Sequence, residues 1–321
     1  EVVTHGYVVD GEGRKFSKSL GNGVEPRQLL EKFGMDIIRL WVASTDYTDD
    51  IRYSSIIMDG ASEAYRRFRN TFRWLLGNLN GWDGKAVAYA DLPELEQYML
   101  HRLGVVLGEI RGHFEAYQFH KAYRAVYEFC GGDLSNFYFD VRKDVLYCDP
   151  ASSLERRGCL TVLDIIFRAL VTYLAPILPF TCDEAWRSYG NTDSVHLATF
   201  VPVGKEWVRD DEFVTRWKTI FEVREVMNQA AEARRSQSKL GANSTAMAML
   251  IAEKLPFGET DSGLLREVCG TSYMHVNKQK QREDFWNDDS SSIQCVLEPH
   301  VGEKCPRCWR YFGGEMMGER M

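Results

Sequence analysis

Apolar residues recur at spacings of three and four through the central part of the chain. The clearest stripe consists of Leu92, Leu95, Met99, Leu103, Val106, Ile110 and Phe114. Because residues three and four apart lie on one face of a helix, this stripe predicts a long amphipathic helix. Further helices are predicted around 122–147 and 154–174. Long amphipathic helices joined by short connections are typical of a helical bundle, which we expect between residues 54 and 200.

Shorter elements precede the predicted bundle. Residues 4–10 have the character of a strand, and a glycine-rich turn follows them. Pro26 suits the first turn of a short helix that Gly34 ends. Asp36 is the predicted N-cap of a second short helix.

The pattern changes after the bundle. Residues 195–201 are predicted to form an extended connector, followed by a helix over 211–239. Two apolar runs, 245–251 and 292–297, are typical of strands. A small α/β module is therefore expected after the helices, so the predicted fold class is mainly α with a small α/β addition.

The composition is that of a soluble globular protein. The 321 residues are 45% hydrophobic and 26% charged, and no apolar run reaches the ~18 residues that a transmembrane helix needs. The formal net charge of −7 argues against a globally basic nucleic-acid binder but leaves local basic patches open. No membrane association is expected.

The ends and the cysteines add two expectations. The chain begins at Glu1 without an initiator Met or a signal peptide, and we expect it to be a piece of a longer protein. The cysteines upstream of residue 300 have no regular spacing, which favours buried thiols in a reducing, cytoplasmic environment.

Two lysines and two serines are concentrated in the segment Gly13–Asn22. Lys15 and Lys18 are three residues apart, with Ser17 and Ser19 beside Lys18. Two compact ammonium groups on a loop suit a polyanion such as a nucleotide triphosphate, and the hydroxyls add donors. A solvated surface turn is the alternative explanation of the same residues.

A cluster of arginines lies in a predicted helix after residue 54. It consists of Arg66, Arg67, Arg69 and Arg73, interleaved with aromatic residues. Arginine forks suit phosphate contacts, and an adjacent aromatic ring could stack on an unpaired base. Alternatively, the aromatic rings face the core and the arginines only solvate the outer face.

Cys305 and Cys308 have the C-x-x-C spacing of a zinc-binding turn. A closed structural site needs four ligands, and none of the residues after Cys308 is Cys or His. The nearest upstream candidates are Cys295 and His300. The pair therefore predicts an incomplete Zn²⁺ site; a redox pair is the alternative, although no thioredoxin-like βαβ pattern surrounds it.

The segment Gly13–Asn22 resembles the signature loop of class I aminoacyl-tRNA synthetases, which normally reads Lys-Met-Ser-Lys-Ser; Phe16 replaces the methionine. Residues Asp36–Arg52 and Asn70–Leu79 are similar to the isoleucyl branch of that family. The C-x-x-C pair resembles the start of the zinc module that ends the bacterial isoleucyl enzymes.

The resemblance implies roles for the candidate residues. Lys15 and Lys18 would stabilise adenylate formation from ATP with Mg²⁺, and the ATP-binding loop would be Lys15, Phe16, Ser17, Lys18 and Ser19. The arginines at 66, 67, 69 and 73 would contact the tRNA backbone. The implied partners are tRNA(Ile), isoleucine and ATP, and the implied state is a monomer.

The resemblance also implies an organisation in four parts. Residues 1–53 would be the edge of a Rossmann-type catalytic domain, 54–200 an anticodon-binding bundle, 201–299 an α/β junction module and 300–321 a truncated zinc module. The His-Ile-Gly-His signature is absent from the chain. We therefore expect the chain to bind tRNA but not to aminoacylate it by itself. A valyl-type fragment and a non-catalytic helical RNA-binding module remain alternatives.

Overall fold

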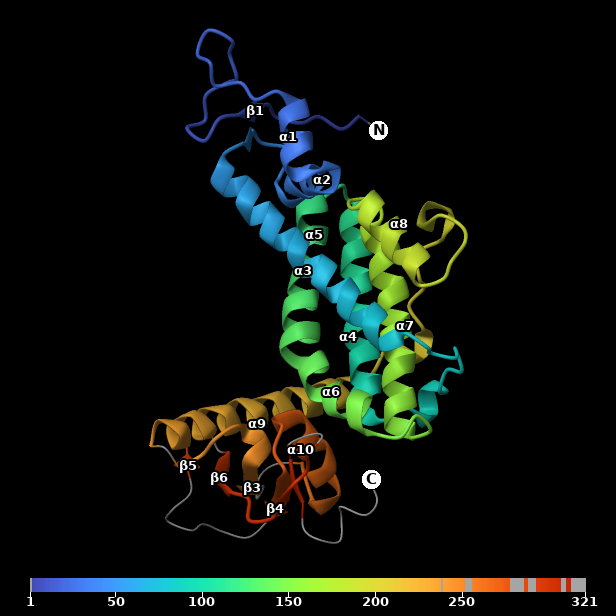
Figure 1. Cartoon of the computed structure of the whole chain (residues 1–321), viewed down its shortest axis with the longest axis vertical. Coiled ribbons are helices and arrows are strands. Elements are labelled where there is room, and N and C mark those ends of the chain that lie inside the picture. Colours follow the sequence, from blue (N-terminus) through green and yellow to red (C-terminus); the bar gives the residue numbers. More distant parts are fainter. Residues whose placement is uncertain are drawn as a thin grey trace. The chain divides into compact units, whose positions relative to one another are not determined.

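The computed structural model describes residues 2–237, 239–251, 256–277, 286–287, 293–306 and 310–312. Helices dominate this part of the chain (Figure 1), which confirms the predicted mainly α fold. Two compact units are present. The first contains Glu1–Ala88, Met99–Asp140 and Gly158–Val208, and the second contains Tyr89–Tyr98, Val141–Arg157 and Arg209–Met321.

The first unit begins with a short strand, β1 (Val8–Val9), that pairs in parallel with β2 (Ile51–Arg52). Between them lie the helices α1 (Pro26–Phe33) and α2 (Met35–Ser44). As predicted, Pro26 opens α1 and Gly34 ends it. Gly34 has φ 77°, a conformation that glycine adopts without steric penalty, and it lets α2 start at once in a new direction.

Helix α2 is anchored on the turn between two later helices, α7 (Leu154–Leu174) and α8 (Pro179–Ser188). The Asp36 carboxylate is buried and accepts hydrogen bonds from the Thr181 backbone N–H (2.7 Å) and hydroxyl (2.6 Å). The prediction that Asp36 is the N-cap of its own helix is wrong, because Gly34 occupies that position. Asp36 instead satisfies the N-terminal amide groups of α8.

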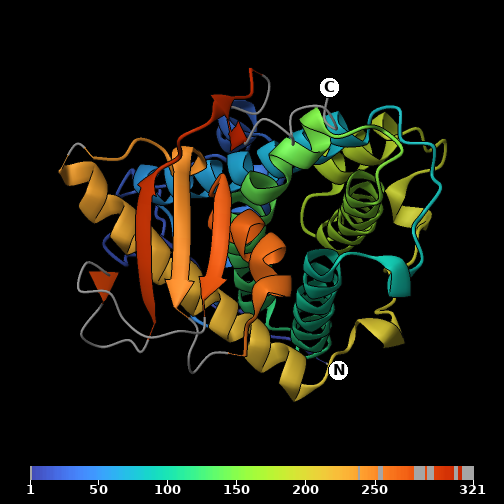
Figure 2. The ribbon, with the colours of Figure 1, turned by 90° about the horizontal axis from the view of Figure 1, so that it is seen from below.

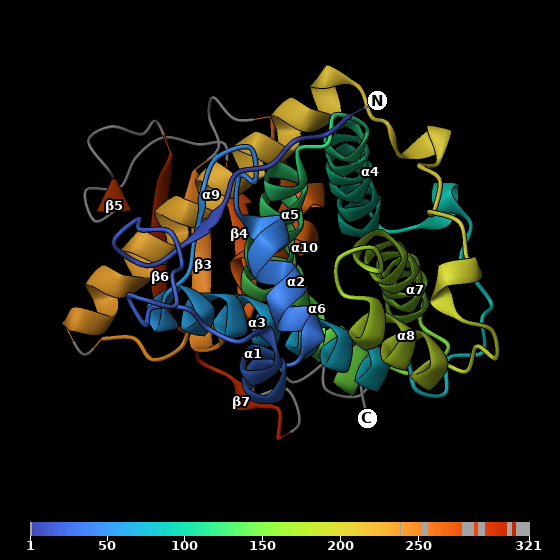
Figure 3. The ribbon, with the colours of Figure 1, turned by 90° about the horizontal axis from the view of Figure 1, so that it is seen from above.

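Arg39 completes this anchor from the same helix. Its Nη2 donates to the Pro176 carbonyl (2.7 Å) and its Nε to the Ile177 carbonyl (3.1 Å). Figures 1 and 3 show α2 beside α8 and α5 (Phe119–Glu128). The segment before residue 54 is thus tied to the bundle by side chains of opposite charge.

The bundle is built from long helices with apolar faces. Besides α5, α7 and α8 it contains α3 (Ser55–Leu79), α4 (Glu94–Glu115) and a π-helical stretch, Phe129–Tyr138. The helix that follows this stretch, α6 (Phe139–Cys148), belongs mainly to the second unit. All members of the predicted apolar stripe are buried except Phe114, which is half-buried. The Ser54 side chain caps α3 by accepting from the Ile57 N–H. The predicted extended connector is wrong at Val195–Leu197, which form a single 3-10 turn.

The second unit contains a mixed sheet covered by helices (Figure 2). Its strands are β3 (Ala246–Ile251), β4 (Tyr273–Asn277), β5 (Trp286–Asn287) and β6 (Gln294–Pro299), in the order β4-β3-β6-β5. Helices α9 (Asp211–Ser236) and α10 (Ser262–Cys269) contact each other and the sheet, and so cover the same face. This arrangement confirms the predicted α/β module. Strand β6 begins two residues later than the predicted strand over 292–297, and α9 ends three residues before the predicted end at residue 239.

A buried ion cluster stabilises the second unit. The Arg142 guanidinium on α6 is 1% exposed and donates to both oxygens of Glu96 at 2.6 Å, and the Glu96 side chain is fully buried. The Nη1 atom of Arg142 also donates to the Glu267 carboxylate on α10, at 2.8 Å. Because a buried charge is costly without its partner, these carboxylates make the position of Arg142 specific.

Buried thiols occur in both units. The side chains of Cys130, Cys182, Cys269 and Cys295 are buried, and burial raises the pKa of Cys130, Cys269 and Cys295 to about 12. These thiols therefore stay protonated and unreactive at neutral pH. Within the described ranges, no helix combines the length and apolarity needed to cross a bilayer.

Replacing Asp36 with Ala should destabilise the first unit by about 2 kcal/mol, because the amide groups at the start of α8 lose a charged acceptor. Urea unfolding followed by circular dichroism measures the change. Asp59→Ala is the matched control, since Asp59 is an exposed carboxylate on α3. Equal stability of the two variants would contradict the anchoring role.

Replacing Glu96 with Leu should cost about 3–5 kcal/mol, because the buried Arg142 guanidinium then loses the carboxylate that accepts two of its hydrogen bonds. The double variant Glu96→Leu with Arg142→Met should lose less than the single one, since it removes both buried charges. Thermal unfolding compares the two with the exposed control Glu109→Leu. A double variant that is less stable than the single one would refute this explanation.

Candidate nucleotide-binding loop and RNA-binding face

The lysine-containing segment forms two consecutive turns after β1, at the blue end of the chain in Figure 1. In the first turn the Gly13 N–H donates to the Asp10 carbonyl (3.0 Å) and the Asp10 N–H to the Arg14 carbonyl (2.9 Å). In the second turn the Gly21 N–H donates to the Ser17 carbonyl at 3.1 Å. The backbone therefore has a defined path rather than that of an open loop.

The two lysines lie on the exposed side of these turns. The Lys15 ammonium is 3.9 Å from the centroid of the Tyr7 ring, a cation–π distance. Ser17 and Ser19 share a hydroxyl–hydroxyl hydrogen bond of 2.7 Å. The half-buried Phe16 ring packs edge-on against the Tyr53 ring, with 6.3 Å between the two ring centroids. The segment thus combines an apolar anchor with an exposed, positively charged surface.

Asp10 was not among the predicted site residues, yet its carboxylate accepts hydrogen bonds from several parts of the lysine segment. It is 9% exposed and accepts from the backbone N–H of Glu12 and from both the N–H and the Nε of Arg14. The Asn22 amide donates to it at 2.9 Å. The hydrogen bonds from Asn22 and Arg14 hold the pKa of Asp10 well below its usual range. The carboxylate is therefore ionised at any physiological pH.

The four predicted arginines all lie on the outer side of α3, while Phe68 and Phe72 are buried. The rings are thus part of the core, as the alternative explanation of the cluster held. Arg66 pairs with Glu63, and the Arg67 guanidinium lies 4.3 Å from the centroid of the Tyr127 ring.

Arg69 and Arg73 line a cavity of about 280 Å³ beside α8. Arg69 donates to Glu184 at 3.3 Å and to the Tyr65 hydroxyl at 3.2 Å. The hydrogen bond to Tyr65 and the charge of Glu184 raise the pKa of Arg69. Arg73 has no polar partner among the described residues. It is therefore the arginine of this face that remains available for an external anion.

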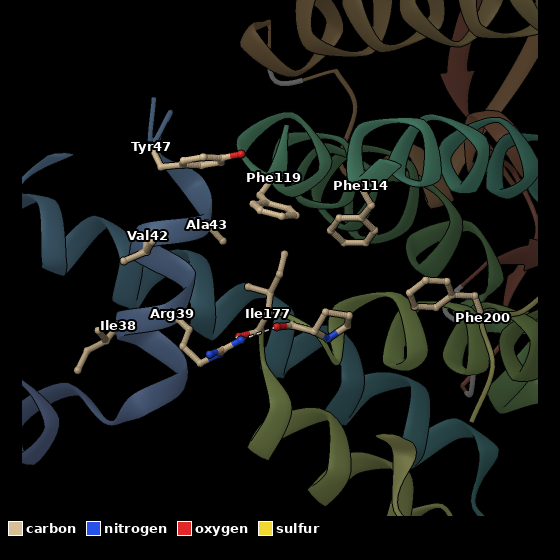
Figure 4. Close-up of a pocket in the computed structure, with 10 residues that line it drawn as sticks. Ile38, Arg39, Val42, Ala43, Tyr47, Phe114, Phe119, Ile177 and Phe200 are labelled. Carbon is tan, nitrogen blue, oxygen red and sulfur yellow. Dashed lines mark hydrogen bonds between the residues drawn. The ribbon is translucent and has the colours of Figure 1, made fainter. Parts of the chain in front are cut away.

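A separate apolar cavity of about 580 Å³ opens between α2, α5 and the α7–α8 turn (Figure 4). Phe114, Phe119, Ile177 and Phe200 point toward it, and the Arg39 head is engaged with the turn. None of the predicted site residues lines it. No motif in the sequence indicated this cavity, because its walls come from segments far apart in the chain.

Cys305 follows the short strand β7 (Glu303–Lys304), which pairs in antiparallel fashion with β8 (Tyr311–Phe312). The Cys305 N–H donates to the Arg310 carbonyl at 2.8 Å, next to this pairing. Cys308 lies outside the described residues. No group of three or more side chains able to hold a metal is found among the residues that the structure describes.

Two protein-family models match the chain. Residues 1–54 match tRNA synthetases class I (I, L, M and V), and residues 96–250 match the anticodon-binding domain of tRNA ligase. The first match contains the lysine segment and α2, and the second contains much of the bundle. Together with the loop geometry, they define the class as that of the class I aminoacyl-tRNA synthetases.

Comparison with curated relatives shows which branch of the class I synthetases the chain is most similar to among those compared. The isoleucine-tRNA ligase of Brucella abortus is 42% identical over 97% of this chain, and that of Agrobacterium fabrum is 42% identical over 96%. The ligase of Bartonella henselae is 39% identical over 97%. The chain therefore belongs to the isoleucine-tRNA ligase family. It spans about a third of the length of these relatives, 32% in each case.

A solved structure shares the fold. It is the ternary complex of a LeuRS from Agrobacterium radiobacter K84 with tRNA and LeuAMS, with a TM-score of 0.50 and 21% sequence identity. The match covers 64% of this chain and 24% of that one. At this identity the likeness concerns the fold alone. The curated relatives, in contrast, favour the isoleucyl branch over the valyl alternative.

Proposed function

We propose that the chain is the part of an isoleucine-tRNA ligase that carries the lysine loop and binds the anticodon arm of tRNA(Ile). The observation that carries this proposal is 42% identity to isoleucine-tRNA ligases over 97% of the chain. In the proposed organisation, residues 1–53 belong to the catalytic domain and 54–200 to the anticodon-binding bundle. Residues 201–299 form the junction module, and 300–321 begin a zinc module.

In the complete ligase, isoleucine would react with ATP to give an aminoacyl-adenylate and pyrophosphate, and the aminoacyl group would then pass to the tRNA. Negative charge builds on the departing pyrophosphate. The exposed Lys15 and Lys18 would stabilise that charge together with Mg²⁺. Ser17 and Ser19 would support the turn, and Phe16 would hold it against Tyr53.

Among the arginines on α3, we propose that Arg73 makes the main phosphate contact. Its guanidinium is exposed and without a polar partner in the described part of the chain. Arg66 and Arg69 would have to give up surface ion pairs, which cost little to break. Arg67 lies on the Tyr127 ring and would contribute less.

Three further assignments belong to this proposal. Cys305 and Cys308 would supply two thiolate ligands for Zn²⁺, as their C-x-x-C spacing favours. Two more ligands would be required to close the site. The ligase would act in the cytoplasm, where buried thiols stay reduced, and as a monomer.

Binding of this chain to tRNA(Ile) and tRNA(Val) transcripts at two salt concentrations tests the proposal. We expect tighter binding of tRNA(Ile), dependent on its anticodon, and affinity that falls as salt rises because phosphate contacts release counterions. Equal binding of the two transcripts with a steep salt dependence would instead indicate nonspecific phosphate contact. It would contradict anticodon recognition by this chain.

In the same assay, Arg73→Ala should weaken tRNA binding roughly 3- to 10-fold and reduce the salt slope by about one, as loss of one phosphate contact requires. Arg111→Ala is the matched control, because Arg111 is an exposed arginine of α4 paired with Glu115. Identical behaviour of the two variants would argue against a phosphate contact at Arg73.

The role of the lysines can be tested in a chimera in which this chain replaces the matching region of the Brucella abortus ligase. Lys18→Ala should lower the kcat of ATP–pyrophosphate exchange by about 10²- to 10³-fold, since one donor to the transition-state charge is lost. Lys32→Ala, an exposed lysine on α1, is the control. An unchanged kcat for Lys18→Ala would refute the assignment.

A further inference from the structure

The two ends of the lysine loop are joined by a single side-chain pair. Asn22 donates from Nδ2 to Asp10 Oδ2 at 2.9 Å, across twelve residues of chain. The same amide accepts the Ser17 N–H at 2.9 Å through its Oδ1 and donates to the Lys15 carbonyl at 3.3 Å. One amide at the end of the loop thus contacts both its start and its middle.

Asp10 offers the matching acceptor. Its Oδ1 accepts the backbone N–H groups of Glu12 and Arg14, and its Oδ2 accepts Arg14 Nε and Asn22 Nδ2. Every group that faces the carboxylate in these contacts is a donor. The pair therefore joins an acceptor at residue 10 to a donor at residue 22.

The loop needs such a closure for an electrostatic reason. Arg14, Lys15 and Lys18 carry like charges within five residues, and these repel one another. Asp10 pairs with Arg14 at 2.9 Å, which leaves the two lysines as the unneutralised charges. Without a tie at its base, the loop would open to separate them and would lose the geometry that a polyphosphate requires.

We propose that Asp10 and Asn22 form a latch that closes the base of the lysine loop and sets the positions of Lys15 and Lys18. Both are positioning residues, because they contact the loop backbone and Arg14 and do not reach the lysine ammonium groups. The latch rests on the proposed function only where it concerns phosphate binding. The closure of the loop itself is a property of this chain.

The test exploits the polarity of the pair. Asn22→Asp places a second carboxylate against Asp10, whereas the exchanged variant Asp10→Asn with Asn22→Asp restores one amide and one carboxylate. Amide hydrogen exchange of residues 11–23 in the whole chain reports on the loop. We expect exchange at least about tenfold faster in Asn22→Asp. In the exchanged variant we expect a partial return towards the wild-type rate, because one amide–carboxylate hydrogen bond is restored while Arg14 Nε loses its charged acceptor.

Glu12→Gln is the control, because it removes a carboxylate from the loop but keeps the backbone N–H that Asp10 accepts. The amide hydrogens of residues 11–23 should exchange at the wild-type rate in this variant. Wild-type exchange in Asn22→Asp, or equal exchange in the single and exchanged variants, would overturn the latch. Circular dichroism of each variant reports whether the helices remain folded.

A second measurement separates the latch from the proposed function. In the Brucella abortus chimera, Asn22→Asp should lower the kcat of ATP–pyrophosphate exchange by about tenfold with the KM for isoleucine unchanged, and the exchanged variant should recover part of this loss. Suppose that amide exchange responds as expected while Lys18→Ala leaves kcat intact. The lysine assignment would then fail, and the latch would stand.

Discussion

The first unit depends on one electrostatic arrangement, in which α2 meets the α7–α8 turn with two charges of opposite sign. Asp36 accepts the first amide groups of α8, and Arg39 donates to the carbonyls of Pro176 and Ile177. A helix start has unpaired donors and the end of the preceding segment has unpaired acceptors, so one carboxylate and one guanidinium satisfy both. This anchor joins the lysine-loop segment to the bundle.

The charged side chains of this chain fall into two groups, those that structural contacts neutralise and those that stay exposed. Arg14 is paired by Asp10, Arg39 by backbone carbonyls and Arg142 by two carboxylates. Lys18 and Arg73 lie exposed instead. Because a surface cation keeps its full attraction for phosphate only when no carboxylate neutralises it, these are the two residues for which we propose contacts with ATP and with tRNA.

Local sequence signals located most of the helices and the lysine loop. Gly34 marked a real helix end, and the apolar spacing between Leu92 and Phe114 marked a real buried face, because both depend on neighbours in the chain. The role of Asp36 was misassigned, since an acidic residue before an apolar run looks like a local cap. Its true partner, Thr181, is 145 residues away.

The sequence by itself determined the helical class, the family resemblance and the residue types of the candidate site. These follow from periodicity and from motifs whose members are close together in the chain. Only the tertiary structure decided which charges are neutralised: that Arg67 lies on Tyr127, that Arg73 has no polar partner in the described residues, and that Asn22 closes the loop on Asp10. The physical reason is that charge pairing depends on distances in space, which spacing along the chain does not encode.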